Sequence, residues 1–232
     1  MNKTLVMSLV LLLTLGTVGA TNIDLRFFLF GLTEPVYEGT EELKEELTSC
    51  TASMFTLGKQ GGIGSCSGTI IKEERGNHHL ITAKHCLHVT EEMYFDNVPA
   101  SLIIASADDD LAYVILDGKI KDKKVANIAR WDSSIGETIH HVGYPSEHLY
   151  ISTGKVHRIT KDDYWAYLES RGGCSGGSIF NEKGELAGVL WGGYDTYKEK
   201  ITVYEPIKDV KKFLKTMEKL IDIKDPSEKP KE

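Results

Sequence analysis

The chain has 232 residues, a formal net charge of -7 and 41% hydrophobic residues. This composition is typical of a globular protein and excludes a disordered chain, and the length allows one large domain or two small ones. The acidic balance argues against a nucleic-acid partner, because binding to phosphate groups needs a basic surface.

The first twenty residues have the pattern of a removable secretory signal. Lys3 supplies the positive start, residues 5–15 form an apolar run, and Val18-Gly19-Ala20 places small residues where a signal peptidase cuts. The run is shorter than the about 20 residues of a membrane-spanning helix, which disfavours the alternative of an uncleaved anchor. We therefore expect a secreted, periplasmic or extracellular protein, with no stable membrane insertion after the signal is removed.

Residues 21–47 are interpreted as an N-terminal arm, whose acidic run 41–47 is typical of one or two helical turns or of a leader. From residue 48 onward, short segments rich in β-branched and aromatic residues alternate with turn signals such as Asp117-Gly118. Such spacing predicts a β-sandwich or a barrel. The expected strands include residues 68–71, 79–82, 101–104, 112–116, 138–142 and 185–190.

The end of the chain changes its period. Apolar residues recur at helical spacing over residues 207–222, and Pro206 stands where a helix can begin. We expect this helix to pack on the strands and to complete a domain that covers residues 48–224. The tail 225–232 has two prolines and no large apolar residue, and we expect it to be disordered.

Four cysteines are present, at positions 50, 66, 86 and 174. In an oxidising compartment this even number permits disulfides, with three full pairings among which spacing alone does not choose.

The segment Gly172-Gly173-Cys174-Ser175-Gly176-Gly177 is a candidate nucleophile loop. A serine hydroxyl needs a base to remove its proton, and the developing oxyanion needs donors already in place. Flanking glycines let the backbone turn sharply, so that the N–H groups of Gly173 and Ser175 could form an oxyanion hole. A plain glycine-rich loop is the alternative.

Two other segments supply the partners that a serine nucleophile needs. His85 follows an apolar strand and precedes a cysteine, which gives it a rigid support as a general base. Asp110 leads into the apolar strand 111–116, where its carboxylate could orient the imidazole. Asp108 and Asp109 are rivals, because a run of three aspartates is also typical of a solvated turn.

The chain has eight histidines, among them the adjacent pairs His78-His79 and His140-His141. We interpret these pairs as ordinary strand residues, because the usual zinc spacing motifs are absent. We expect no metal and no cofactor.

The motifs T-A-K-H-C, D-L-A and G-C-S-G-G resemble those of the chymotrypsin-like (trypsin-fold) serine peptidases, and their order His, Asp, Ser is the order of that family. The resemblance extends from about Cys50 to the terminal helix. It is closer to compact bacterial-type secreted members than to vertebrate digestive zymogens.

The resemblance implies an all-β fold of two antiparallel six-stranded β-barrels with a C-terminal α-helix. It also implies a Cys66–Cys86 disulfide, which would contribute about 3 kcal/mol to stability and brace the histidine. The implied site residues are the catalytic His85, Asp110 and Ser175, the oxyanion-hole residues Gly173 and Ser175, and the substrate-pocket residues Glu169, Trp191, Gly192 and Thr202. An acidic Glu169 at the pocket floor would favour Lys or Arg substrates.

The chain also departs from the pattern of the digestive enzymes. They carry Asp before the nucleophile and an Ile-Val-Gly-Gly start after cleavage, whereas this chain has Cys174 and no such start, so we do not expect that kind of zymogen activation. Cys174 has three interpretations: a buried thiol, a disulfide partner of Cys50, or, least favoured because Gly-Gly follows Ser175, the nucleophile.

The resulting hypothesis is a secreted, monomeric serine endopeptidase that hydrolyses protein or peptide substrates through an acyl-enzyme intermediate. The alternative is a catalytically inactive trypsin-fold binding or scaffold protein. Ester hydrolysis would use the same machinery, and the sequence does not separate it from peptide hydrolysis.

Overall fold

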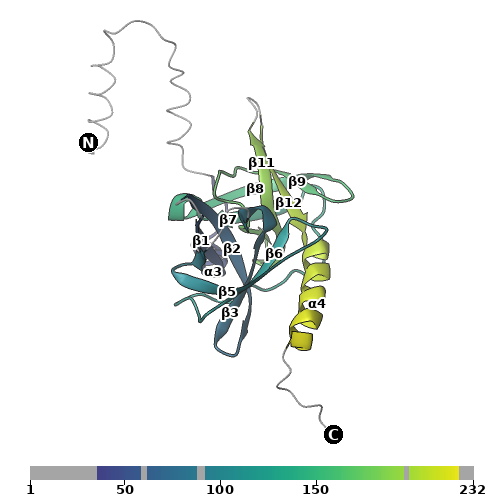
Figure 1. The fold of residues 1–232 in the computed structure, drawn as a ribbon. Coiled ribbons are helices and arrows are strands. Elements are labelled where there is room, and N and C mark those ends of the chain that lie inside the picture. The colour runs from purple at the N-terminus through teal and green to yellow at the C-terminus, as the bar shows by residue number, and fades with distance from the viewer. Residues whose placement is uncertain (1–35, 59–61, 88–91, 196–198, 225–232) are drawn as a thin grey trace, which may run out of the picture. The chain divides into compact units, whose positions relative to one another are not determined.

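The computed structural model describes residues 36–58, 62–87, 92–195 and 199–224. Within these residues, twelve strands form two closed antiparallel barrels of six strands each, followed by a C-terminal helix (Figure 1). This confirms the all-β class and the two-barrel fold that the resemblance implied, and it decides against a sandwich.

Both barrels have the same strand topology. The first closes in the order β1-β2-β3-β6-β5-β4, and the second, numbered from β7, closes in the equivalent order β7-β8-β9-β12-β11-β10. The strands of the first barrel are β1 (Thr51–Leu57), β2 (Ile63–Glu74), β3 (Asn77–Ala83), β4 (Glu92–Phe95), β5 (Val98–Ala105) and β6 (Leu111–Leu116). Those of the second are β7 (Thr138–Gly143), β8 (Tyr150–Ile159), β9 (Tyr164–Tyr167), β10 (Ser178–Asn181), β11 (Leu186–Asp195) and β12 (Lys200–Pro206).

Four helical segments accompany these strands in the described part of the chain. They are α3 (Glu41–Ser49), the short 3₁₀ turns η1 (Lys84–Leu87) and η2 (Pro145–Glu147), and the terminal helix α4 (Ile207–Lys224).

Strand β6 shows why some strands are apolar along their whole length. Successive side chains of a strand point to opposite faces. Val114 and Leu116 belong to the core of the first barrel. Leu111 and Tyr113 belong to a second cluster, which also contains Val189 of the second barrel. Both faces of β6 are therefore buried, and an uninterrupted apolar run results.

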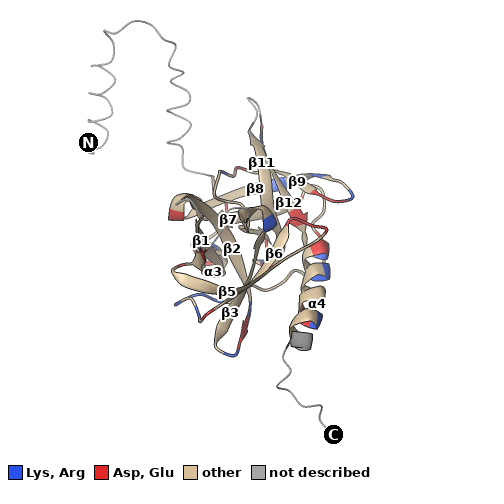
Figure 2. Cartoon of the chain, viewed as in Figure 1, with Lys and Arg blue, Asp and Glu red and all other residues tan. Residues whose placement is uncertain are grey.

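The cluster between the barrels also receives α4. Val210, Phe213 and Met217 recur on one face of this helix and pack into that cluster. The helix start is held by Asp132, which accepts a 2.9 Å hydrogen bond from the backbone N–H of Lys208. Lysine and acidic side chains occupy other positions along the helix (Figure 2). The apolar residues that recur at helical spacing over residues 207–222 therefore lie on helix α4, which packs against both barrels.

Part of the segment expected to be an arm packs on the first barrel. Helix α3 begins after Thr40, whose side chain accepts a hydrogen bond from the N–H of Leu43. At its other end Leu47 is completely buried. The ammonium group of Lys123 donates to the carbonyl of Thr48 at 2.9 Å.

The expected signal 1–20 and tail 225–232 lie outside the described residues. Among the helices that the structure describes, none combines the length and the apolar character needed to cross a membrane.

The cysteines divide into two kinds. Cys66 on β2 and Cys86 on η1 form the disulfide that the resemblance implied. Cys50 and Cys174 are buried free thiols that belong to different core clusters. A disulfide between Cys50 and Cys174, the alternative considered from the sequence, is therefore not formed in this structure.

Replacing both bridged cysteines by alanine is expected to lower the free energy of unfolding by about 3 kcal/mol, because the bridge closes a loop of twenty residues. Chemical denaturation followed by fluorescence measures this change. As a control, a reducing agent should bring the unmodified protein to the stability of the variant and leave the variant unchanged. Equal stability of the oxidised protein and the variant would contradict the prediction.

Candidate active site

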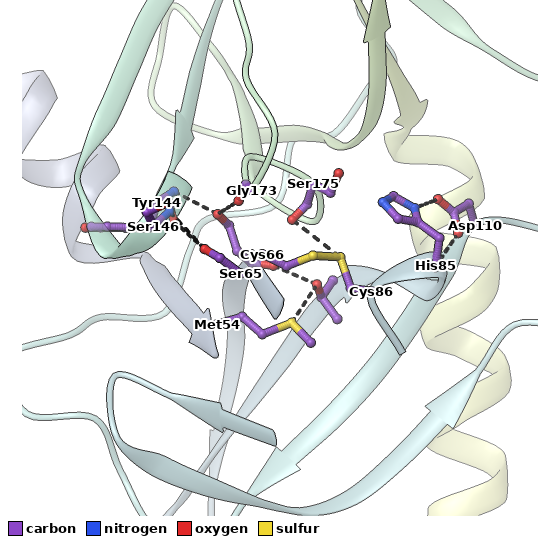
Figure 3. The surroundings of a disulfide bond; sticks show 12 residues. Met54, Ser65, Cys66, His85, Cys86, Asp110, Tyr144, Ser146, Gly173 and Ser175 are labelled. Atoms are coloured by element: carbon purple, nitrogen blue, oxygen red, sulfur yellow. Dashed lines mark hydrogen bonds and ion pairs between the residues drawn. A yellow bond between two sulfur atoms is a disulfide. The ribbon is translucent and has the colours of Figure 1, made fainter. Parts of the chain in front are cut away.

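The structure brings His85 and Asp110 together at one end of the first barrel. His85 Nδ1 lies 2.6 Å from Asp110 Oδ2, and Asp110 Oδ1 accepts the backbone N–H of His85 at 2.8 Å. The backbone of the loop is tied down as well, since Lys84 N–H donates to the Asp110 carbonyl at 3.1 Å. The carboxylate therefore holds both the ring and the main chain of the histidine (Figure 3). The imidazole is 39% exposed and accessible to a ligand.

The other two aspartates of the run have different partners. Asp108 is 77% exposed and lies 3.9 Å from Lys212 of α4. Asp109 accepts a hydrogen bond from the hydroxyl of Ser106 at 3.3 Å. Of the three carboxylates, only that of Asp110 contacts the imidazole, because it alone stands where the turn enters β6.

Ser175 lies on the loop between β9 and β10 of the second barrel. Two glycines of this loop have positive φ, Gly173 at 94° and Gly176 at 77°. A Cβ at position 176 would lie 2.1 Å from Thr82 Oγ1 and 2.3 Å from the carbonyl oxygen of Ser67. Only glycine fits there, because both the backbone conformation and the space exclude a side chain. The sharp turn that the glycine pattern predicted is thus present.

The loop leaves two N–H groups available at its tip. The N–H groups of Cys174, Gly176 and Gly177 donate to backbone carbonyls. Within the described residues, those of Gly173 and Ser175 have no acceptor. Two free backbone donors on either side of a buried residue can bind a developing negative charge.

Ser67 of β2 anchors this loop to the first barrel. Its N–H donates to the Ser175 carbonyl at 2.8 Å, and its hydroxyl donates to the Gly173 carbonyl at 3.0 Å. The same hydroxyl accepts the N–H of Tyr144 at 2.8 Å. Sequence reasoning missed this role, and the only signal was a small polar residue inside a strand next to a bridged cysteine.

His85 and Ser175 therefore come from different barrels. Figure 3 shows the imidazole of His85 between Asp110 and Ser175. Within the described part of the chain the Ser175 hydroxyl makes no hydrogen bond, so the side chain is free to rotate toward the ring. Such loose geometry is common in active sites without substrate and tightens when substrate binds.

The Cys174 side chain belongs to the core of the second barrel. It is fully buried, and burial raises the pKa of its thiol to about 12. Because the thiolate is the nucleophilic form, a thiol in this environment is inert.

The residues expected to form a substrate pocket lie on neighbouring segments. Thr202 on β12 donates from its hydroxyl to the carbonyl of Leu168 at 2.8 Å. Gly192 has open space on its Cβ side. The indole N–H of Trp191 donates to Asp163 at 3.3 Å.

Glu169 does not stand alone at this pocket. Its carboxylate lies 2.6 Å from the ammonium group of Lys200 and 3.4 Å from the guanidinium group of Arg171. Burial is the largest single influence and raises the pKa of Glu169, but the hydrogen bonds and the positive charge of its neighbours, Lys200 foremost, together outweigh it and leave the pKa below its usual value. One carboxylate thus faces two cations, neither of which the sequence pattern singled out. A cavity of about 450 Å³ adjoins this group, lined by Val36, Ser152, Thr153, Tyr167, Leu168, Glu169, Glu199 and Lys200.

The sequence model of the trypsin-like peptidase domain matches residues 66–189, which is more than half of this chain. The chain belongs to the trypsin-like peptidase family. The match begins at the bridged Cys66 and ends in β11, so it spans the histidine turn, the aspartate turn and the loop of Ser175.

Curated relatives include the glutamyl endopeptidases of Staphylococcus aureus strains MW2, MSSA476 and N315. Each is 25% identical over 155 residues, and the aligned part covers 55% of this chain. It covers 46%, 45% and 44% of the three relatives, so this trypsin-like chain spans a little under half of their length.

Replacing Asp110 by Asn is expected to lower kcat for peptide hydrolysis by about 10⁴-fold, because an amide no longer holds the imidazole in the tautomer that accepts a proton. Steady-state hydrolysis of a fluorogenic peptide measures this loss. Asp108→Asn makes the same chemical change on the exposed neighbour and should stay within about twofold of the wild type. Similar losses in both variants would argue against a specific role for Asp110.

Proposed function

We propose that this trypsin-like peptidase is a secreted serine endopeptidase that uses Ser175 as nucleophile, His85 as general base and Asp110 as the orienting carboxylate. The observation that supports this most strongly is the pairing of His85 with Asp110 on one barrel, facing a serine on a glycine turn of the other. An inactive binding protein would have no need of both the pairing and the free N–H groups.

In the first half of the reaction, Ser175 Oγ attacks the carbonyl carbon of the scissile bond while its proton passes to His85 Nε2. The carbonyl oxygen becomes an oxyanion, which accepts hydrogen bonds from the N–H groups of Gly173 and Ser175. Asp110 stabilises the imidazolium without taking its proton. His85 then gives the proton to the leaving amine as the C–N bond breaks, and an acyl-enzyme remains.

In the second half, water replaces the amine. His85 accepts a proton from the water molecule while the water oxygen attacks the acyl carbon. The same two N–H groups stabilise the second oxyanion. The proton returns to Ser175 Oγ as the ester bond breaks, which releases the carboxylic acid and restores the enzyme.

Two independent features support secretion. Residues 1–20 have the charge, apolar run and small residues of a cleavable signal. The bridge between Cys66 and Cys86 is a stabilising disulfide of the kind that persists in oxidising compartments. Both features favour an enzyme that meets its protein or peptide substrates outside the cytoplasm.

The charges around Glu169 bear on the residue before the scissile bond, called P1. A lone acidic floor would favour Lys or Arg. With Lys200 and Arg171 both on its carboxylate, the group of three carries a net positive charge, and Lys200 is the member of it that brings a cation into the cavity lining, beside Glu169 and Glu199. We therefore propose that the pocket prefers an acidic P1 residue, and the name of the glutamyl endopeptidases among the relatives agrees with this preference.

The nucleophile is tested by labelling with a fluorophosphonate and by casein cleavage. The wild type should react and cleave, Ser175→Ala should do neither, and Cys174→Ala should still be labelled because its thiol is buried. Retained labelling of the Ser175 variant would exclude this residue as nucleophile. An unreactive wild type would support the inactive scaffold, and ester cleavage without casein cleavage would support an esterase.

The pocket is tested with peptides that differ only in having Glu, Arg or Phe at P1. We expect kcat/KM for Glu to exceed that for Arg, and Lys200→Met to lower the value for Glu by about tenfold, a change worth ~1.4 kcal/mol. Lys121→Met removes the same charge at a position that is 92% exposed and serves as the control. A preference for Arg that Lys200→Met leaves unchanged would contradict the proposal.

A further inference from the structure

Asp110 is held through every polar group it has. Both carboxylate oxygens bind His85, and the carbonyl accepts the N–H of Lys84. Its own N–H donates to Oε1 of Glu205 at 3.0 Å. The first three contacts stay within the first barrel, whereas Glu205 belongs to β12 of the second. The Glu205 contact therefore fixes the aspartate relative to the barrel that carries Ser175.

The pleat of β12 explains how Glu205 reaches this position. Tyr204 points into the core of the second barrel, so its neighbour Glu205 must point to the opposite face. Its partner across the sheet is Val189, a member of the cluster between the barrels. Glu205 is only 7% exposed. Burying a carboxyl group at such a place costs free energy unless the group is hydrogen-bonded. The hydrogen bond that this position provides is the one from the Asp110 N–H.

The charges around Glu205 are acidic. Asp109 and Asp110 face it from the turn before β6, Asp163 from the β8–β9 turn and Asp209 from the first turn of α4. Neighbouring β11 contributes only apolar residues and glycine opposite it. Figure 2 shows acidic residues where β12 meets α4. Among the described residues no Lys, Arg or His forms an ion pair with Glu205.

Burial, together with the nearby aspartates, raises the pKa of Glu205 to about 7, although the Asp110 N–H opposes this shift. Two cations of α4 are engaged elsewhere: Lys212 lies 3.9 Å from Asp108, and Lys208 donates to the carbonyl of Lys161.

We infer that Glu205 is a positioning residue for catalysis, which holds the main chain of Asp110 from the second barrel and so sets the orientation of His85 toward Ser175. This inference rests on the proposed function. The hydrogen bond strengthens when Glu205 is ionised, since bonds to charged acceptors are about twice as strong as neutral ones. The ionised carboxylate also adds negative charge near the imidazolium that forms in the transition state. Activity should therefore depend on both the oxygen and the charge of this side chain.

Two substitutions separate these contributions. Glu205→Gln keeps a carbonyl oxygen for the Asp110 N–H and removes the titration, whereas Glu205→Leu keeps the volume and removes the acceptor. Asp96→Asn is the matched control, because Asp96 is also a shielded carboxylate that accepts a backbone N–H, that of Ser53 at 3.0 Å, but it does not contact Asp110. For each full-length protein we would measure the fluorophosphonate labelling rate, and kcat and KM for the preferred peptide, from pH 5 to pH 9.

We expect Glu205→Leu to lower kcat and the labelling rate by about tenfold or more with KM within about twofold. Glu205→Gln should match the wild type at pH 5.5 and fall severalfold below it at pH 8, where the wild-type carboxyl is ionised. Asp96→Asn should follow the wild type throughout.

Unfolding experiments provide a readout that does not use activity. The neutral Glu205 carboxyl is favoured in the folded state, so its contribution to stability is complete below the unfolded pKa of about 4.5 and is lost as the pH rises through about 7. The free energy of unfolding of Glu205→Gln should not show this decrease with rising pH. The measurement does not depend on whether Glu205→Leu folds.

The outcomes are distinguishable. If the wild type is not labelled at all, the proposed function fails and the positioning role fails with it. A labelled wild type allows the positioning role to be judged separately. If the ratio of wild-type kcat/KM to that of Glu205→Gln then stays constant with pH, and Glu205→Leu labels at the wild-type rate or does not fold, this inference is overturned. Glu205 is in that case a structural residue only.

Discussion

The contact between the two barrels is the constraint on which the site depends. Apolar side chains from both barrels and from α4 form one buried cluster there, with Leu111, Val189 and Phe213 among its members. This apolar contact holds the barrels together but has little directional preference. Polar contacts supply direction, and they cross the interface both ways: Ser67 of the first barrel holds the loop of Ser175, and Glu205 of the second barrel holds the aspartate turn.

This arrangement explains why the candidate active site lies between the barrels rather than within one. A barrel of six strands fills its own interior with side chains and leaves no room for a substrate. Turns at the barrel ends are free to carry polar groups, and rigid strands on both sides keep them in place. His85 leaves the end of β3, Asp110 enters β6, and Ser175 precedes β10. The disulfide at Cys86 adds a covalent support next to the histidine.

Two glutamates show how surroundings decide the behaviour of one residue type. Glu169 has Lys200 and Arg171 as partners, so its pKa is lowered despite burial. Glu205 has acidic neighbours and a single backbone donor, so its pKa is raised to about 7. The first is suited to a permanently charged pocket wall, and the second to a contact whose strength changes near neutral pH. Neither property follows from the identity of the residue, because each depends on groups that other segments of the chain supply, such as Lys200 for Glu169 and the Asp110 N–H for Glu205.

Local patterns in the sequence were sufficient for six of the twelve described strands, for the helix of residues 207–222 and for the short motifs around His85, Asp110 and Ser175, because alternation, helical period and glycine turns are properties of neighbouring residues. The pairing of Cys66 with Cys86 came from family resemblance, since spacing alone allowed three pairings. The choice of Asp110 among the three aspartates also came from that resemblance, because the run itself left Asp108 and Asp109 as rivals. Only the tertiary structure decided that Cys50 and Cys174 stay apart, and that Glu169 and Glu205 meet opposite charge environments. These outcomes depend on which strand ends the barrel topology places side by side, as in the contact that joins Asp110 to Glu205 across 95 positions of the chain.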